Sequence, residues 1–220
     1  GRILLDAFEY AGEPAWAPLA AARRAARLEP PLDAARRAYL LAHLDARLGD
    51  PAGARRTLDA LRPPADDPVS VASVEQLRRR VEAELAWRAG RPAEALARLG
   101  EPRAPLFHAT PSMPALADAR WLRGELLAAL GRDDEALRWF GSFPDPSGYD
   151  LAALAPAHLR RATLHERRGE RRAAAAHYRR VIALWEGGDP ELREMVEAAR
   201  RRLAGVERGE GGRGKAGGPI

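Results

Sequence analysis

The sequence has no cysteine and a single lysine, Lys215, and both scarcities exclude kinds of chemistry. Without cysteine there are no disulfides, no thiolate metal ligands and no thiol nucleophile. Lys215 lies in a glycine-rich tail, which argues against a Schiff-base lysine and against a phosphate-binding GxxxxGK[ST] loop. The longest apolar stretches are short and are interrupted by arginine, as at Arg23 and Arg24, so we expect no membrane span.

Aromatic residues are also few, at 6% of 220 residues, whereas alanine contributes 47 residues and leucine 29. Because alanine favours helices and its small side chain lets them pack closely, this mixture predicts helices rather than a sheet. A chain of this length can bury a sizeable core. It begins with Gly1 and shows no charged-then-apolar leader, so we expect a processed chain or part of a longer, cytoplasmic protein.

The positive charge is a weak indication of a nucleic-acid partner. Of the 36 basic residues, 35 are arginine, and the net charge of +5 gives a pI near 10.3. The excess is small and is interleaved with acidic residues, as on an ordinary solvated surface. We expect the runs Arg78-Arg79-Arg80 and Arg171-Arg172 to face solvent, and no interleaved aromatic residues mark them as a phosphate-binding surface.

Glycine recurs at a nearly fixed spacing and marks an internal repeat. Gly49, Gly90, Gly131 and Gly169 are 41, 41 and 38 residues apart, and each stands between two helix-like segments. A glycine at such a turn can adopt a positive φ and close the first helix of a pair. We therefore predict four units, numbered in chain order, in which two helices meet at the glycine and stack on the next unit.

Other positions keep their residue type relative to these glycines. Small residues stand seven positions before each glycine and five positions after it. Leucine stands five positions before each glycine, and a large apolar residue stands nine positions after it. In this order the columns are Ala42, Ala83, Gly124 and Ala162; Ala54, Ala95, Ala136 and Ala174; Leu44, Leu85, Leu126 and Leu164; and Leu58, Leu99, Phe140 and Tyr178. Small residues let two helix backbones approach, and the large residue fills the space one turn beyond.

Both ends of the chain fit the same scheme. Gly12 lies 37 residues before Gly49 and suggests a fifth, degenerate helix pair. The run Asp189-Pro190-Glu191 predicts the start of a terminal helix with one apolar stripe, which would cap the array. Pro-rich connections at 63–68, 102–114 and 143–156 separate the units. We therefore predict a helical array over residues 1–204 and a disordered, glycine-rich tail over 205–220.

This pattern resembles the tetratricopeptide repeat (TPR) across roughly residues 33–185. That family has small residues at its eighth and twentieth positions, glycine at the turn and an apolar or aromatic residue at its twenty-fourth, and the columns above match these positions. Its apolar seventh position is met only by Leu41, and the spacing of 38 to 41 exceeds the family's period of about 34. The resemblance implies an all-α, right-handed α-solenoid of four to five antiparallel helix pairs with a C-terminal capping helix.

In that family the first helices of the pairs line a concave, peptide-binding surface, so the resemblance also implies site residues. They are Arg36, Tyr39, His43 and Arg47 in the first unit; Leu77, Arg80, Glu84, Trp87 and Arg88 in the second; Trp121 and Glu125 in the third; and Leu159, Thr163, Glu166 and Arg167 in the fourth. Three aromatic rings among several arginines would be typical of a binding hot spot. Alternatively, these rings pack between repeats.

No group of side chains has the spacing of a catalytic, cofactor or metal site. No two histidines lie four apart beside a glutamate, as a zinc enzyme would require, and no serine lies in a GxSxG or SxxK motif. His158 and His165 are seven residues apart on one predicted helical face, which favours a surface or inter-helix position. We therefore expect no enzyme activity, no cofactor and no bound metal.

These patterns favour a non-catalytic scaffold that binds a peptide or a partner helix on its concave face. Similar arrays often follow kinase, cyclase or transcription-factor domains, so we expect a larger bacterial regulatory protein whose upstream domains are also candidate partners. One alternative is a nucleic-acid or anionic-surface binder that uses the arginines, whose affinity would fall steeply with salt. Another is an enzyme in which a deep pocket joins His158 and His165 to acidic residues.

Overall fold

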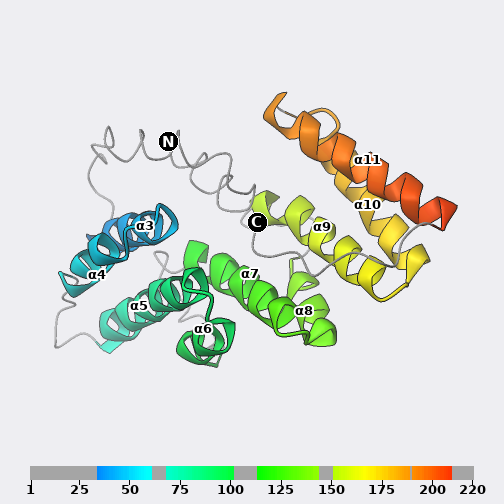
Figure 1. The fold of residues 1–220 in the computed structure, drawn as a ribbon. Coiled ribbons are helices and arrows are strands. Elements are labelled where there is room, and N and C mark those ends of the chain that lie inside the picture. The colour runs from blue at the N-terminus through cyan, green and yellow to red at the C-terminus, as the bar shows by residue number, and fades with distance from the viewer. Residues whose placement is uncertain (1–33, 61–67, 102–112, 144–150, 189, 210–220) are drawn as a thin grey trace.

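The structure, a computed structural model, describes residues 34–60, 68–101, 113–143, 151–188 and 190–209. Every regular element in these ranges is a helix and none is a strand, so the predicted all-α class is confirmed for them. Figure 1 shows the helices following one another from α3 and α4 at one end to α10 and α11 at the other. The degenerate pair predicted around Gly12 lies outside the described residues.

Helices that are consecutive in the sequence pack as neighbouring pairs. The pairs are α3 (Ala34–Arg47) with α4 (Pro51–Asp59), α5 (Pro68–Arg88) with α6 (Pro92–Leu99), α7 (Met113–Ala129) with α8 (Asp133–Phe140), and α9 (Leu151–Arg167) with α10 (Arg171–Trp185). Each first helix also contacts the first helix of the next pair, and α11 (Arg193–Arg208), after the 3₁₀ turn η3 (Pro190–Leu192), packs on α10. Contacts between sequence neighbours are what a helical repeat requires.

The four repeat glycines close the first helices, as predicted. Their φ angles are 80° at Gly49, 73° at Gly90, 72° at Gly131 and 73° at Gly169, in the left-handed region that disfavours residues with a Cβ. At the second unit, Gly90 N–H donates to Trp87 O (2.9 Å) and Arg91 N–H to Ala86 O (3.0 Å), so the last carbonyls of α5 are satisfied. A Cβ at these glycines would touch nothing within 4 Å, so backbone conformation rather than crowding requires glycine.

The small-residue columns lie where two helices meet. Ala54, Ala95, Ala136 and Ala174 are each 0% exposed, as predicted for a close helix contact. At Gly124, the third-unit member of the other column, a Cβ would lie 2.7 Å from the ring of Phe140. The large residue of that unit therefore occupies the space that an alanine methyl group takes in the other units.

Local signals in the sequence set several helix starts. Asp50 accepts a hydrogen bond from Gly53 N–H at 2.8 Å and precedes Pro51 at the first position of α4. α6 begins at Pro92 without a side-chain cap from Arg91. Three acidic residues fill the first turn of α8, where they complement the helix dipole.

The C-terminal helix continues past its predicted end, so the predicted boundary of the disordered tail at 205 is corrected. α11 runs through Gly205 to Arg208, because Val206 is buried in the apolar cluster that holds Tyr178. Gly209 ends the helix in the left-handed conformation, with φ 87°. Residues 210–220 lie outside the described residues.

Pro156 lies inside helix α9, although the sequence predicted a connection that extended to this residue. Proline lacks a backbone N–H and therefore removes one hydrogen bond from the helix. The neighbours Ala153, Leu154, Ala155 and Ala157 are all buried, so the packing of this turn offsets the lost hydrogen bond.

The core is a series of small clusters that follow one another along the chain. Tyr39 and Leu77 belong to a cluster between α3 and α5, and Ala83 and Leu122 to one between α5 and α7. The next clusters centre on Trp121 with Phe140 and on Tyr178 with Val181. Each unit therefore buries its apolar stripe against its neighbours rather than around one common centre.

Candidate binding face on the first helices

Three first helices meet at a network of charged and polar side chains. From α5, Arg80 Nη1 donates to Glu84 Oε2 at 3.0 Å, and Arg80 Nη2 donates to Asp118 Oδ1 of α7. From α3, the hydroxyl of Tyr39 donates to Asp118 Oδ2 at 2.6 Å. Tyr39, Arg80, Glu84 and Asp118 thus link the first three units, and we call these four residues the buried network.

Two further arginines and one histidine surround the buried network. Arg88 Nε donates to Glu84 Oε1 at 2.9 Å, and Arg47 Nε lies 3.4 Å from the same oxygen. His43 Nδ1 lies 3.9 Å from Asp118 Oδ2. Among the described residues, three guanidinium groups therefore face two carboxylates, which leaves an excess of positive charge while the histidine is neutral.

The centre of this assembly is withdrawn from water. Arg80 and Glu84 are each 1% exposed, and Asp118 is 0% exposed. Burial lowers the pKa of His43 to about 3, so its ring is neutral near pH 7. Burial by itself would raise the pKa of Glu84, but Arg47 and Arg80 hold that pKa well below its usual range. The carboxylate therefore stays ionised, and its buried charge depends on the arginines.

The repeat register explains why these side chains meet. Tyr39 and Arg80 stand ten positions before their glycines, His43 and Glu84 stand six before, and Arg47 and Arg88 stand two before. Asp118, which the sequence analysis did not select, stands thirteen before Gly131, in the column that holds Arg36 and Leu77. Extending this column to the third unit would have found it.

The aromatic members of the predicted face are enclosed to different degrees. Trp121 is buried, with its ring edge-on to Phe140 (5.2 Å between centroids) and to Phe143 (6.3 Å). Trp87 is half-buried against the cluster that contains Leu122. Trp121 thus packs within the third unit, whereas part of the Trp87 side chain remains exposed to solvent.

The predicted residues of the third and fourth units lie apart from the buried network. Glu125 Oε1 accepts a hydrogen bond from Arg160 Nε of α9 at 2.5 Å. The hydroxyl of Thr163 donates to Leu159 O at 3.0 Å, and Arg167 Nε donates to Asp133 Oδ2 at 3.1 Å. These contacts join α7, α8 and α9 and continue the polar face at partly exposed positions.

The remaining predicted positions have other roles. Leu77 is buried in the first core cluster, and Leu159 packs half-buried against the cluster of α10 and α11. Glu166 Oε2 accepts hydrogen bonds from the Tyr178 hydroxyl at 2.6 Å and from Arg202 Nη2 at 3.0 Å. The side chain of Arg36 lies outside the described residues.

The expectation that the Arg78-Arg79-Arg80 run faces solvent is wrong for Arg80. Arg79 pairs with Glu75 at 2.8 Å on the partly exposed side of α5, whereas Arg80 points into the buried network. Consecutive residues on a helix are about 100° apart, so a run of one residue type must face different environments.

Three histidines converge between α9 and α10, although the sequence analysis connected only two of them. His158 Nδ1 lies 2.9 Å from His177 Nδ1, the ring of His165 stacks on His177 at 5.4 Å, and His165 Nδ1 lies 2.5 Å from Glu170 Oε2. Burial lowers the pKa of His158, and burial together with Arg161 lowers that of His177 to about 4. The rings of His158 and His177 are thus neutral near pH 7, and the three rings are one another's packing partners.

Within the described residues, no group of three or more histidine or carboxylate side chains is placed to hold a metal ion. No helix in the same ranges is long and apolar enough to cross a membrane. No family model, curated protein or solved structure matches the chain.

Proposed function

We propose that the chain is a TPR-like, right-handed α-solenoid that acts as a non-catalytic scaffold and binds a peptide or a partner helix on the face of its first helices. The observation that carries this proposal is the use of equivalent positions in successive units to build one polar face. Those positions are Tyr39 with Arg80, His43 with Glu84, and Arg47 with Arg88. A face assembled in this way is fixed before a partner arrives, which lowers the ordering cost of binding.

The buried network and the partly exposed residues around it have separate parts in this proposal. The network holds α3, α5 and α7 in register and lies too deep to touch a partner. Trp87, Arg88, Glu125, Thr163 and Arg167 are exposed or half-exposed, and they supply the contacts. Tryptophan and arginine are the residue types most enriched among binding hot spots.

The test begins with peptides selected from a random-sequence display library on the purified chain. Their dissociation constants are then measured by calorimetry for the natural sequence, Arg88→Ala and Trp87→Ala. We expect each substitution to weaken binding about tenfold, which corresponds to about 1.4 kcal/mol. The matched control is Arg138→Ala, which removes an exposed arginine from the second helix α8.

Helicity measured by circular dichroism separates lost contacts from lost structure. Trp87 is chosen over Trp121 because Trp121 is buried and its removal would disturb the core. The proposal is wrong if no peptide is selected, or if the selected peptides bind the Arg88 and Trp87 variants as well as they bind the Arg138 variant. The selected sequences would also indicate whether a separate protein or an upstream domain is the partner.

Nucleic-acid binding has less support, because many arginines face carboxylates of this same chain. Arg167 pairs with Asp133, Arg168 with Asp134, and Arg202 with Glu166, each across two helices. Arginines engaged in this way must give up these partners before they bind phosphate. A steep loss of affinity for DNA or RNA between low and moderate salt would nevertheless favour this alternative.

A further inference from the structure

The histidine cluster, which consists of His158, His165 and His177, bridges the two helices of the fourth unit. His158 of α9 and His177 of α10 lie with their Nδ1 atoms 2.9 Å apart and their ring centroids 5.1 Å apart. One of these nitrogens must donate and the other must accept, so at least one ring has to lack a proton at Nδ1. If both rings were protonated, two donors would face each other across the contact between α9 and α10.

The charges around the histidine cluster oppose its protonation. The guanidinium group of Arg161 lowers the pKa of His158 and of His177. Glu170 Oε2 contacts His165 Nδ1 at 2.5 Å, and Glu170 Oε1 also pairs with Arg168 Nε at 2.8 Å. The charged side chains that α7, α8 and α11 bring to α9 pair elsewhere along it: Glu125 with Arg160, Asp133 with Arg167, Asp134 with Arg168, and Arg202 with Glu166. Within the described part of the chain, Glu170 is therefore the carboxylate that contacts the cluster.

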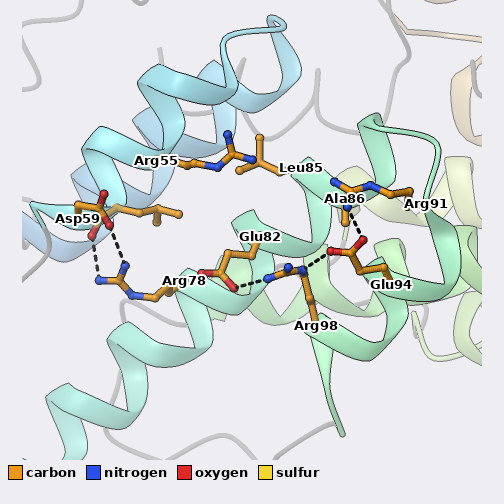
Figure 2. A pocket seen from close by; sticks show the side chains of 10 residues that line it. Arg55, Asp59, Arg78, Glu82, Leu85, Ala86, Arg91, Glu94 and Arg98 are labelled. Carbon is orange, nitrogen blue, oxygen red and sulfur yellow. Dashed lines mark hydrogen bonds and ion pairs between the residues drawn. The ribbon is translucent and has the colours of Figure 1, made fainter.

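The second unit joins its two helices through groups of another kind. Figure 2 shows Arg98 of α6 between Glu82 of α5 and Glu94 of α6. Arg98 Nη1 donates to Glu82 Oε2 at 3.3 Å, and Arg98 Nε donates to Glu94 Oε1 at 2.8 Å. Arginine and glutamate side chains ordinarily keep their charges between pH 7 and pH 5, whereas histidine gains a proton in this range. The second unit thus serves as a comparison that mild acid should leave unchanged.

We propose that the histidine cluster is an acid-sensitive latch, whose protonation releases α10 and α11 from α9 while the units before them stay folded. In an array whose units contact their sequence neighbours, the terminal helices can open without the others. Tyr178 and Val181 of α10 share an apolar cluster with Val206 of α11, so these two helices should move together. Their release would expose Leu159 and Ala162 of α9, which belong to the same cluster. This latch needs no partner and is independent of the proposed scaffold function.

The difference in proton affinity between the closed and open forms sets the size of the effect. Burial and Arg161 lower the pKa of His177 from 6.5 to about 4 in the closed form. Between pH 7 and pH 5 this difference alone would favour the open form by about twentyfold. Because the ring is half-exposed and solvent screens its charge, we expect a shift of about tenfold.

The experiment measures how well the structure protects a single introduced thiol, since the natural sequence has no cysteine. Ala174→Cys and Ala95→Cys place the thiol at equivalent, fully enclosed positions of the fourth and second units. The rate of labelling by dithiodipyridine is divided by the rate for the same variant unfolded in urea at the same pH. Between pH 7 and pH 5, protection should fall about tenfold in Ala174→Cys and less than about twofold in Ala95→Cys.

A second substitution in the Ala174→Cys chain tests whether the histidine cluster causes this response. His177→Gln removes the titrating ring, so protection should no longer change between the two pH values, whatever its level at pH 7. Ala176→Gln introduces the same residue at the exposed neighbouring position and should keep the full response. The latch is refuted if protection in Ala174→Cys does not fall, if it falls equally in Ala95→Cys, or if the fall persists in His177→Gln.

Discussion

The two ends of the described array join their helices in different ways. Between α3, α5 and α7 the contact encloses Arg80, Glu84 and Asp118, whereas α10 and α11 meet through the apolar residues of the Tyr178 cluster. At the second contact the ion pairs lie outside, as between Arg179 and Glu207 at 2.5 Å. Removing one partner of an ion pair therefore has different effects on stability at the two contacts. A buried charge that loses its partner is left uncompensated, whereas an exposed charge is solvated by water.

The largest expected difference between the two ends comes from removing one buried charge. Asp118→Ala removes one of the two carboxylates that pair with Arg80 and also the acceptor of the Tyr39 hydroxyl, and we expect it to destabilise the fold by about 3–5 kcal/mol. Urea unfolding followed by circular dichroism measures this loss. Glu207→Ala, which breaks an exposed pair at the other end, should barely move the transition midpoint. Equal effects of the two substitutions would contradict the distinction between the two contacts.

A smaller loss of stability is expected when a residue of the buried alanine column, which is shared by all four units, is enlarged. Ala136→Trp forces a large ring into a fully enclosed contact between α7 and α8, and overpacking of this kind costs about 1–3 kcal/mol or more. The melting temperature should fall clearly in calorimetry. Ala176→Trp, at an exposed position of α10, is the control and should melt near the natural chain. An unchanged melting temperature for Ala136→Trp would refute the role given to the alanine column.

The smallest expected effect is a dependence on pH at the C-terminal end. The pKa of His177 is lowered from 6.5 to about 4 by burial and by Arg161, so the unfolded chain binds the proton more readily than the folded one. This contribution to stability is complete above pH 6.5 and is lost as the pH falls from 6.5 to about 4. Because the ring is half-exposed, we expect roughly 1–2 kcal/mol.

His177→Gln should therefore flatten the stability curve between pH 6.5 and 4.5, as measured by urea midpoints at several pH values. Below this window carboxylates such as Glu170, whose pKa His165 and Arg168 lower, begin to contribute as well. His43 at the other end, with its pKa lowered to about 3, keeps part of the acid sensitivity in the variant. Identical curves for the variant and the natural chain would contradict the histidine contribution.

The turns and helix contacts could be predicted from the sequence because they depend on short-range geometry. Gly49, Gly90, Gly131 and Gly169 all adopt positive φ, and the alanine column is fully buried. The extent of α11 was missed, because Val206 is held by an apolar cluster to which α10 also contributes. The glycine-rich composition favoured a disordered tail from residue 205, whereas packing keeps the helix continuous to Arg208.

The sequence predicted which positions form the candidate face, but not which of their side chains are buried. Arg80 carries the charge of a surface residue, and its burial follows only from the carboxylates that α5 and α7 bring to it. His177 likewise joined His158 and His165 only when α10 folded back onto α9. Periodicity finds residues that share a helix face, whereas burial depends on what lies opposite.

By itself the sequence determined the helices, the glycine-closed turns and the spacing at which small residues let helices touch. These features are decided within one or two helical turns, where steric limits and hydrogen bonding leave few choices. The tertiary structure decided which charged side chains are enclosed and which stay exposed. Such outcomes depend on residues far apart in the chain, as Tyr39 and Asp118 are, 79 positions apart and 2.6 Å between their oxygens.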